Sequence, residues 1–543
     1  MQQHDGSGTR SERYREIMGV LAKHGLAAAG AGMRLHPDGE RAQLQAEQLR
    51  LACEELGTTF IKLGQILSTR GDLLPPQYRD ELAKLQDSVA PLDAAIIVTE
   101  IENELGASTA ELFATFDPIP LAAASIGQVH VATLADGRDV VVKVRKPGVR
   151  AVVERDLDIL NGLAASAEKH FPDFADHDVE GLVEEFGDML RAELDYTREA
   201  RNIEIFRGFF GDERGFELPE VIWDRSTAHV LTLTLVRGTK ATEDFSLTKK
   251  RQEAAAQRIA RFVLEPAFVH GIFHADPHPG NVLIRSDGTV GIIDFGMVGR
   301  LSEEQRRRLG DIFLAMEHHD AQRVSDHLID LAPPLAPVDR VAFGAQIGRL
   351  LDRYMSSSLE QVQMGAALGE MLDLIREYGL RMPASVAFLF KAIAMSEGLI
   401  LAIAPGKTIS SFLKPITSKV TLAQLNPEQW AERARQATRE AAELSLELPR
   451  RADRVLADIE RGNLRVWTRL EDLEPVLTRF ERIVERANAT MIAAACIVGI
   501  TILLAVYHPG GWKGAIGWVL WFAIVIAVLW VTRTAWATFR KRG

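Results

Sequence analysis

The spacing of apolar residues separates the beginning of the chain into a helical segment and a β-rich segment. Residues 1–118 carry apolar positions three or four residues apart, as in "AQLQAEQLRLACEELGTTFIKLGQIL", and this pattern predicts helices that stop at Pro75-Pro76. From 119 to 145 the pattern changes to short β-branched runs interrupted by Asp136-Gly137, a dipeptide typical of hairpin turns. The sequence therefore predicts an N-terminal helical region followed by short strands.

The rest of the chain contains further short strands and then long helical stretches. The predicted segments are helices at 150–205, two strands at 221–238, a helix at 248–270, a loop with two strands at 271–299, and helices at 301–415 and 426–486. The helix at 426–486 is charged and amphipathic. We expect it to connect the body of the protein to its C-terminal segment.

Two uncharged runs near the C-terminus, 487–507 and 515–532, are each long enough to cross about 30 Å of hydrocarbon as a helix. Basic residues precede and follow the pair, whereas the connecting turn offers only Lys513. The positive-inside rule then predicts a hairpin in the inner (cytoplasmic) membrane, with the catalytic domain and both termini in the cytoplasm. The alternative is a buried hairpin in a soluble core, but core helices of this length usually carry a polar face.

Composition narrows the class of protein. The 543 residues are 47% hydrophobic and 25% charged, as in ordinary folded proteins. The formal net charge of −11 argues against nucleic acid as the main partner. The two cysteines, Cys53 and Cys496, cannot form a disulfide framework, and this favours a reducing compartment.

Five polar residues stand in the order and spacing that phosphoryl transfer requires. That reaction needs a lysine on the phosphates, an acid that holds the lysine, metal-binding residues and an acid near the nucleophile. Lys143 lies in an apolar strand, and Glu199 lies on a following helix where its partner would be. Asn281 follows Asp276 by five residues, and Asp294 of "DFG" follows it by eighteen, as in the catalytic and metal-binding loops of protein kinases. Singly these signals are weak, but together they predict a kinase-like site.

A zinc site is the rival interpretation of "HADPHPG". His274, Asp276 and His278 alternate and could be metal ligands. Zinc would need helical spacing or further Cys or His residues nearby, and Pro277 and Pro279 exclude a helix. The prolines instead stiffen a loop.

The stretch "LAAASIGQVH" has the position of a kinase glycine-rich loop but is mostly alanine. Its candidate nucleotide-binding residues are Ala122, Ala123, Ala124, Ser125, Ile126, Gly127, Gln128 and Val129. Glycines let backbone N–H groups approach phosphates and permit positive φ, so alanines should stiffen the loop and leave Gly127 as its one permissive position. We therefore expect Ala124→Gly to change nucleotide affinity or to permit unwanted transfer.

Four motifs make the chain resemble the ABC1/UbiB family of atypical protein-kinase-like proteins. They are "KLGQ" at 62–65, "AAASIGQVH" at 122–130, "ELDYTREARN" at 193–202, and "HADPHPGN" followed by "DFG". The resemblance covers roughly residues 45–410 and extends to the C-terminal hairpin. It implies an α+β, bilobal protein-kinase-like fold with an N-terminal helical extension and a C-terminal two-helix transmembrane hairpin.

The resemblance also implies roles for matching residues. Lys143 would contact ATP and pair with Glu199, Asn281 and Asp294 would bind Mg²⁺, and Asp276 would be the catalytic acid or base. In the extension, Lys62, Gly64 and Gln65 form the Lys-x-Gly-Gln motif, which would fold over the active site toward Glu193 and Asp195. The corresponding regions are an extension at 1–118, a kinase-like N-lobe at 119–240, a C-lobe at 241–415, a connector at 416–486 and the transmembrane hairpin at 487–537.

The function implied is a membrane-anchored atypical kinase or ATPase that binds Mg-ATP. It would support isoprenoid quinone biosynthesis of the ubiquinone type, by hydrolysing ATP or phosphorylating a small molecule. A quinone precursor or other isoprenoid lipid, the membrane and lipid-biosynthesis enzymes would be its partners. The extension and the lack of a clear Ala-Pro-Glu segment after Asp294 disfavour a peptide substrate. Thr234 stands where relatives commonly have glutamate, so nucleotide preference stays open. Two alternatives are a true protein kinase and a non-catalytic nucleotide-binding scaffold.

Overall fold

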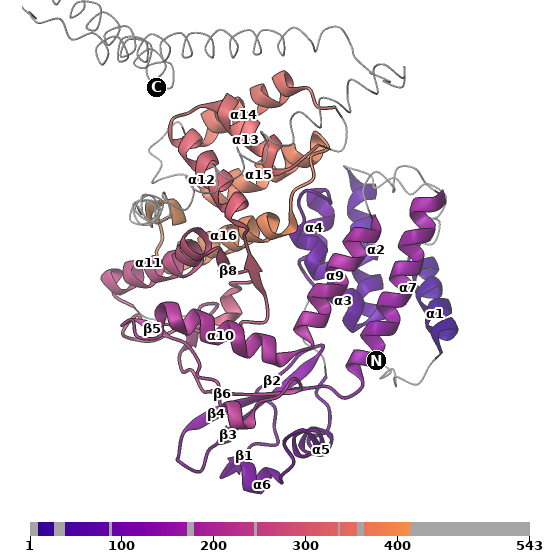
Figure 1. Cartoon of the computed structure of the whole chain (residues 1–543), viewed down its shortest axis with the longest axis vertical. Helices are drawn as coiled ribbons and strands as arrows, with labels where there is room; N and C mark the ends of the chain where they lie inside the picture. The colour runs from indigo at the N-terminus through magenta and orange to yellow at the C-terminus, as the bar shows by residue number, and fades with distance from the viewer. Residues whose placement is uncertain are drawn as a thin grey trace, which may run out of the picture. The chain divides into compact units, whose positions relative to one another are not determined.

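The computed structural model describes residues 9–26, 39–85, 90–170, 179–243, 247–334, 337–355 and 363–412. All of them belong to one compact unit, Met1–Gln429, and a second unit comprises Trp430–Gly543 (Figure 1). The predicted connector at 416–486 and the predicted transmembrane hairpin at 487–537 lie outside the described residues. Both therefore stay predictions.

Six helices form the N-terminal region with its own apolar core. They are α1 (Arg10–Lys23), α2 (Glu40–Leu56), α3 (Thr58–Thr69), α4 (Pro76–Leu82), α7 (Val149–His170) and α9 (Val179–Glu193). The core includes Ile17, Tyr78 and Leu82, each at most 1% exposed. The predicted stop at Pro75-Pro76 is wrong: α3 already ends at Thr69, and Pro76 begins α4, because proline has no N–H to lose at a first helical position.

The first sheet is antiparallel, and α7 and α9 lie between its last two strands in the sequence. Its strands are β1 (Thr115–Phe116), β2 (Ala122–Ala123), β3 (Gly127–Thr133), β4 (Asp139–Arg145) and β6 (Val230–Thr234), in the order β1-β3-β4-β6 with β2 paired to β3. Two helices precede it, α5 (Ala94–Leu105) and α6 (Thr109–Leu112). Ile97 and Ile101 of α5 share a core with Val140, Val142 and Val144 of β4. The sheet itself begins before residue 119, because β1 pairs with β3.

The region after the first sheet is mainly helical and contains two small sheets. The sheets have the orders β5-β10-β9-β7 and β11-β8. The strands are β5 (Phe216–Glu217), β7 (Thr239–Lys240), β8 (Ile272–His274), β9 (Val282–Ile284), β10 (Val290–Ile292) and β11 (Val298–Arg300). The helices are α10 (Tyr196–Phe210), α11 (Lys249–Glu265), α12 (Glu303–Glu317), α13 (Ala321–Leu331), α14 (Arg340–Met355), α15 (Met364–Glu377) and α16 (Ala384–Ile403). Short turns of helix are η2 (Trp223–Arg225), η3 (Pro266–His270), η4 (Pro279–Asn281) and η6 (Ile409–Phe412).

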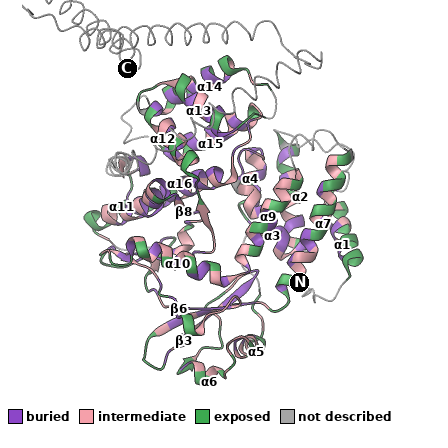
Figure 2. Cartoon of the chain, viewed as in Figure 1, coloured by how far each residue is buried: buried purple, intermediate pink, exposed green. Residues whose placement is uncertain are grey.

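Helix α16 is the most apolar helix of this region. Among the described residues it alone is long and apolar enough to span a membrane, with a mean hydropathy of 2.0, yet 67% of that stretch is buried inside the protein (Figure 2). Its charged residues are Lys391 and Glu397. Glu397 accepts hydrogen bonds from the backbone N–H groups of Met364 and Gly365, at the start of α15. Within the compact unit, α16 is thus a core helix.

Candidate active site

A lysine on β4 lies beside two carboxylates. Lys143 Nζ is 2.5 Å from Glu199 Oε1 on α10 and 3.8 Å from Asp294 Oδ2. The alternation of β4 directs Val140 and Val142 into the core with α5, which leaves Lys143 on the opposite face of the strand. The structure therefore brings together the lysine and the two acids that the sequence predicted.

The charges of this cluster depend on its neighbours. Burial opposes the charge on Lys143, but the carboxylates of Asp294 and Glu199 outweigh it and raise the pKa of Lys143. Burial also opposes the charge on Asp294, whereas Lys143 and, more weakly, Lys62 hold the pKa of Asp294 below its ordinary value. The pKa shifts of Lys143 and Asp294 therefore both favour the charged forms at neutral pH.

The loop that carries Asp294 is held by α10 and β8. Asn202 Nδ2 donates to the Phe295 carbonyl at 2.9 Å, and the Phe295 N–H donates to Glu199 Oε1 at 3.4 Å. From the other side, His274 Nε2 lies 2.5 Å from the Asp294 carbonyl oxygen. Because α10 carries both Glu199 and Asn202, one helix positions the lysine's partner and the loop that carries Asp294.

The catalytic-loop residues follow β8. Asn281 ends η4, and its carbonyl accepts the Ile293 N–H at 3.1 Å, which places Asn281 next to the strand leading to Asp294. Asp276 has a partner that comes from far along the chain: Lys391 Nζ on α16 is 3.2 Å from Asp276 Oδ1. The predicted spacing of Asp276, Asn281 and Asp294 thus corresponds to one continuous loop-and-hairpin structure.

The alanine-rich segment forms a hairpin whose tip is buried. Ala122 and Ala123 pair with β3, and the Ala124 N–H donates to the Gly127 carbonyl at 2.8 Å. The tip residues Ser125 and Ile126 are only 3% and 7% exposed. Thr58 Oγ1 at the start of α3 donates to the Ser125 carbonyl, and Ile126 belongs to a core cluster formed mainly by α7 and α9. Packing against the N-terminal helices thus holds this hairpin.

The structure leaves no room for a side chain at Gly127. A Cβ there would lie 2.3 Å from the Tyr196 hydroxyl oxygen and 2.8 Å from the Val144 carbonyl oxygen. Its φ is not in the positive region that favours glycine. The prediction that Gly127 provides conformational freedom is therefore wrong, because its missing side chain makes room for Tyr196 at the start of α10.

The Lys-x-Gly-Gln motif lies on α3, and its lysine reaches the end of α9. Lys62 Nζ is 2.5 Å from Glu193 Oε1, with 12% and 19% of the two side chains exposed. Asp195 makes a different contact from the one predicted: it caps α10 by accepting hydrogen bonds from the N–H and hydroxyl of Thr197. Gln65 points elsewhere, because its amide donates to the Leu85 carbonyl at 3.2 Å.

These residues surround a cavity of about 720 Å³, within the size range of small-molecule sites. The predicted residues that line it are Lys62, Ala122, Ala124, Ile126, Gly127, Gln128, Val129, Lys143, Glu193, Asp195, Glu199, Asn281 and Asp294. The predicted residues outside its lining are Gln65, Ala123, Ser125 and Asp276.

Two lining residues use their side chains to bind backbone groups. Gln128 contributes little to the cavity through its side chain, because its amide carbonyl accepts the Leu92 N–H. The other wall consists of Leu233, Thr234 and the segment 235–238. The Thr234 hydroxyl accepts the Glu220 N–H at 2.8 Å.

Both histidines of the rival zinc site form hydrogen bonds with backbone groups. His274 accepts the Asp276 N–H at its Nδ1, and its Nε2 contacts the Asp294 carbonyl. His278 Nδ1 accepts the Gly280 N–H at 3.1 Å. The loop therefore uses both histidines to hold its own conformation, and this disfavours zinc.

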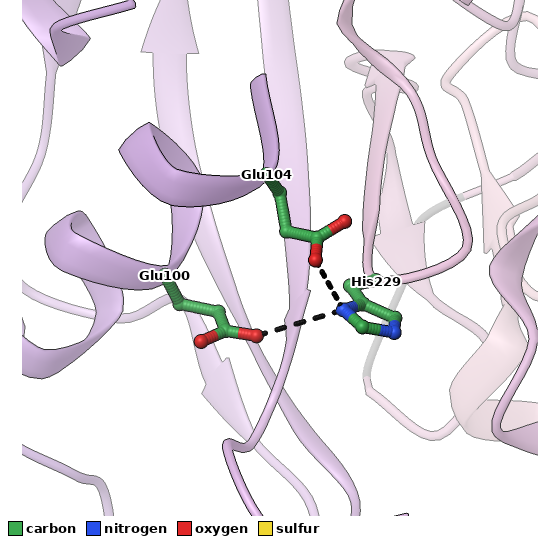
Figure 3. A group of neighbouring side chains, drawn as sticks. All are labelled: Glu100, Glu104 and His229. Atoms are coloured by element: carbon green, nitrogen blue, oxygen red, sulfur yellow. Dashed lines mark ion pairs between the residues drawn. The ribbon is translucent and has the colours of Figure 1, made fainter. Parts of the chain in front are cut away.

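Within the described ranges, the group of His, Cys and acidic side chains close enough to share a metal is Glu100, Glu104 and His229 (Figure 3). It lies where α5 meets the residue before β6, outside the cavity lining. His229 Nε2 also contacts the Arg145 guanidinium, and Thr227 donates to Glu104 Oε2. The neighbouring arginine opposes a bound metal cation, so we interpret the group as a polar link between α5 and the sheet.

Three residues of the site were not predicted from the sequence. Tyr196 fills the space above Gly127, Asn202 holds the Phe295 carbonyl, and Lys391 contacts Asp276. Tyr196 and Asn202 lie in the quoted "ELDYTREARN" segment, so that motif was the available signal. For Lys391 the available signal was a lysine inside an apolar helix. That signal does not identify its partner Asp276, which is 115 residues away in the sequence.

Comparison with known proteins agrees with this geometry. The ABC1 atypical kinase-like domain family matches residues 84–328, and the UbiB helical domain family matches residues 347–406. The probable protein kinase UbiB of Xylella fastidiosa (strain 9a5c) is 30% identical over 87% of this chain and 87% of its own length. The chain belongs to the ABC1/UbiB family. The expected family and its α+β kinase-like fold are thereby confirmed.

Three further proteins show similarity to this chain. An uncharacterised protein of Synechocystis sp. is 33% identical, covering 86% of this chain and 80% of its own length. Protein ACTIVITY OF BC1 COMPLEX KINASE 7, chloroplastic, of Arabidopsis thaliana is 34% identical, covering 80% of this chain and 64% of its own length. A solved structure of Rv3197 with erythromycin, from Mycobacterium tuberculosis, is 23% identical, with a TM-score of 0.48 over 75% of this chain and 98% of that one.

Proposed function

We propose that this ABC1/UbiB protein is a membrane-anchored, ATP-dependent phosphotransferase or ATPase that supports isoprenoid quinone biosynthesis. The observation that carries the proposal is the cluster of Lys143, Glu199 and Asp294 on one cavity wall. A cationic Lys143 held by Glu199 suits the phosphates of a nucleotide. No covalent step by the protein is required, because positioning and charge supply the catalysis.

The residues present fit a nucleotide with a hard divalent cation. Asp294 and Asn281 both line the cavity and offer carboxylate and amide oxygens, which are ligands that Mg²⁺ prefers. When bound, the cation would neutralise charge on the phosphates. The segment 235–238 also lines the cavity and offers backbone groups beside which a base could lie. The buried tip at Ser125 and Ile126 would then cover the phosphates as a fixed element.

Two features support a small acceptor, or water, over a peptide. The segment after Asp294 is short, since β11 begins at Val298 and α12 is already capped by Ser302. Helix α3 also places Lys62 in the cavity lining, where it pairs with Glu193. Both features reduce the surface available to a protein substrate. The quinone pathway and the membrane anchor rest on the family resemblance and on the apolar runs at 487–507 and 515–532.

Two alternatives make different predictions. A protein kinase would transfer phosphate to a protein from the membrane fraction. A non-catalytic scaffold would bind nucleotide, and a deletion strain would be restored equally by wild type and by Asp276→Asn. The short segment after Asp294 speaks against the first alternative, and the assembled Lys143 cluster speaks against the second.

The test uses the full-length protein in lipid nanodiscs. Wild type should hydrolyse ATP in the presence of Mg²⁺, and Asp294→Asn and Lys143→Met should each lower the rate by about 100-fold or more. Asp188→Asn, which changes a surface aspartate whose side chain is 76% exposed, should leave the rate unchanged. Quinone intermediates in a deletion strain should return to normal with wild type but not with Asp294→Asn. Wild type without nucleotide binding or turnover would contradict the enzymatic proposal.

A further inference from the structure

We propose that Lys391, on α16, is a positioning residue that orients the carboxylate of Asp276 for the reaction. Because this assignment gives Asp276 a part in phosphoryl transfer, it rests on the proposed function. Lys391 Nζ lies 3.2 Å from Asp276 Oδ1, and 24% and 33% of the two side chains are exposed. The contact joins two residues 115 positions apart and connects the C-terminal helical region to the catalytic loop.

Lys391 is one of two charged residues in a helix that is otherwise mainly apolar. Its neighbours Leu389, Phe390 and Ala392 are at most 3% exposed, and α16 is apolar along its length. The helix's other charged residue, Glu397, has a structural purpose because it binds the N–H groups at the start of α15. An ion pair as exposed as Lys391–Asp276 contributes little to stability. Stability alone therefore gives a weak account of a lysine at this position.

The catalytic loop itself offers no substitute for this lysine. Residues 274–281 include no lysine or arginine. The two histidines in the loop are engaged by backbone groups, His274 by the Asp276 N–H and His278 by the Gly280 N–H. A cation beside Asp276 consequently has to come from another part of the chain, and in the described residues Lys391 supplies it.

The lysine can orient Asp276 because both ends of the contact are fixed. Asp276 is confined by Pro277 and by the hydrogen bond from its N–H to His274. Lys391 is confined by α16, which packs against α11, α3 and β11. Holding Oδ1 at Lys391 sets the direction of the second carboxylate oxygen, Oδ2. A carboxylate that accepts a proton or orients an attacking hydroxyl needs that geometry.

The experiment compares full-length Lys391→Met and Lys391→Arg with wild type. Lys391→Met should lower kcat for MgATP turnover by about tenfold or more while changing KM less than twofold, since Lys391 acts through Asp276 and does not line the nucleotide cavity. Lys391→Arg keeps the cation and should recover most of the rate. Lys407→Met removes a lysine that is 41% exposed and serves as the matched control. Lys391→Gln replaces methionine should that variant fail to fold.

The variant Asp276→Asn separates positioning from simple destabilisation. If Lys391 acts only through Asp276, then Lys391→Met should cause no further loss in the Asp276→Asn background. Where Asp276→Asn leaves no measurable rate, the recovery of kcat in Lys391→Arg decides instead, and Tm should differ little among wild type, Lys391→Met and Lys391→Arg. Active wild type would overturn the positioning role alone in three cases: a fully active Lys391→Met, rate losses that add to those of Asp276→Asn, or a Lys391→Arg no faster than Lys391→Met. Wild type without turnover would overturn the proposed function and the positioning role together.

Discussion

The ammonium of Lys62 lies 2.5 Å from the carboxylate of Glu193, and this contact joins α3 of the N-terminal region to the last residue of α9. Two residues after Glu193, Asp195 caps α10, the helix that carries Glu199. The residue that Lys62 contacts therefore lies just before the start of α10, the helix whose Glu199 carboxylate contacts Lys143. We infer that the N-terminal region is mechanically part of the site.

Breaking this pair should be costly, because both side chains are mostly buried. Lys62→Met removes the ammonium that contacts Glu193, and Glu193→Gln removes the negative charge that Lys62 contacts. A double-mutant cycle on thermal or denaturant unfolding should give a coupling free energy of about 1–2 kcal/mol. The same cycle applied to Arg138 and Asp136, whose side chains are 47% and 51% exposed, should give a coupling below about 1 kcal/mol. Equal couplings in the two cycles would contradict our view of the Lys62 pair.

Gly64, between Lys62 and Gln65, should tolerate no side chain. A Cβ at Gly64 would lie 2.3 Å from Leu85 Cδ1 and 3.2 Å from Leu82 Cδ2, and both leucines are buried. We expect Gly64→Ala to lower the free energy of unfolding by about 1–3 kcal/mol through overpacking. Gly19 in α1 is the matched control, because a Cβ there meets nothing within 4 Å. Gly19→Ala should stabilise the protein by about 0.5–1 kcal/mol. A neutral Gly64→Ala would show that the leucines move aside freely.

The sequence was informative where local pattern determines position. The apolar run around Lys143 predicted the strand that carries it, and the spacing from Asp276 to Asp294 predicted the loop and hairpin that the structure contains. Asp136-Gly137 forms the predicted turn between β3 and β4, with Gly137 at φ +87°. In each case the information lies within a few residues, where backbone geometry leaves few alternatives.

Contacts between distant segments were not predictable in the same way. The reason for Gly127 is the hydroxyl of Tyr196, and the partner of Asp276 is Lys391 on α16. Gln65 was expected at the site from its motif, but the packing of α3 turns it toward the Leu85 carbonyl. Each of these depends on how helices far apart in the chain pack together. Periodicity within one segment carries no information about such contacts.

Cys53, on α2, should be unreactive in the folded protein. Burial raises the pKa of its thiol to about 12, and the nearby Glu54 carboxylate adds to the effect. The unfolded chain ionises first, at roughly pH 8.5. The stability that this group contributes is therefore complete below that pH and is lost as the pH rises toward the folded-state value. In a Cys496→Ala variant, iodoacetamide at about pH 9 should alkylate Cys53 at least about a hundredfold more slowly in the native state than in concentrated guanidinium chloride. Comparable rates in the two states would mean that α2 opens readily.

The alanine-rich hairpin should owe its rigidity to Ile126 more than to its alanines. Ile126 is 7% exposed in the core cluster shared with α7 and α9, whereas Ala124 carries a single methyl group. Ile126→Ala should lower the free energy of unfolding by about 2–4 kcal/mol and should loosen the hairpin over the cavity. Titration calorimetry should therefore show a larger change in MgATP affinity for Ile126→Ala than for Ala124→Gly. In Ala124→Gly the neighbouring Ser125 and Ile126 stay packed. A larger change in Ala124→Gly would instead support the expectation from sequence that the alanines set the properties of this loop.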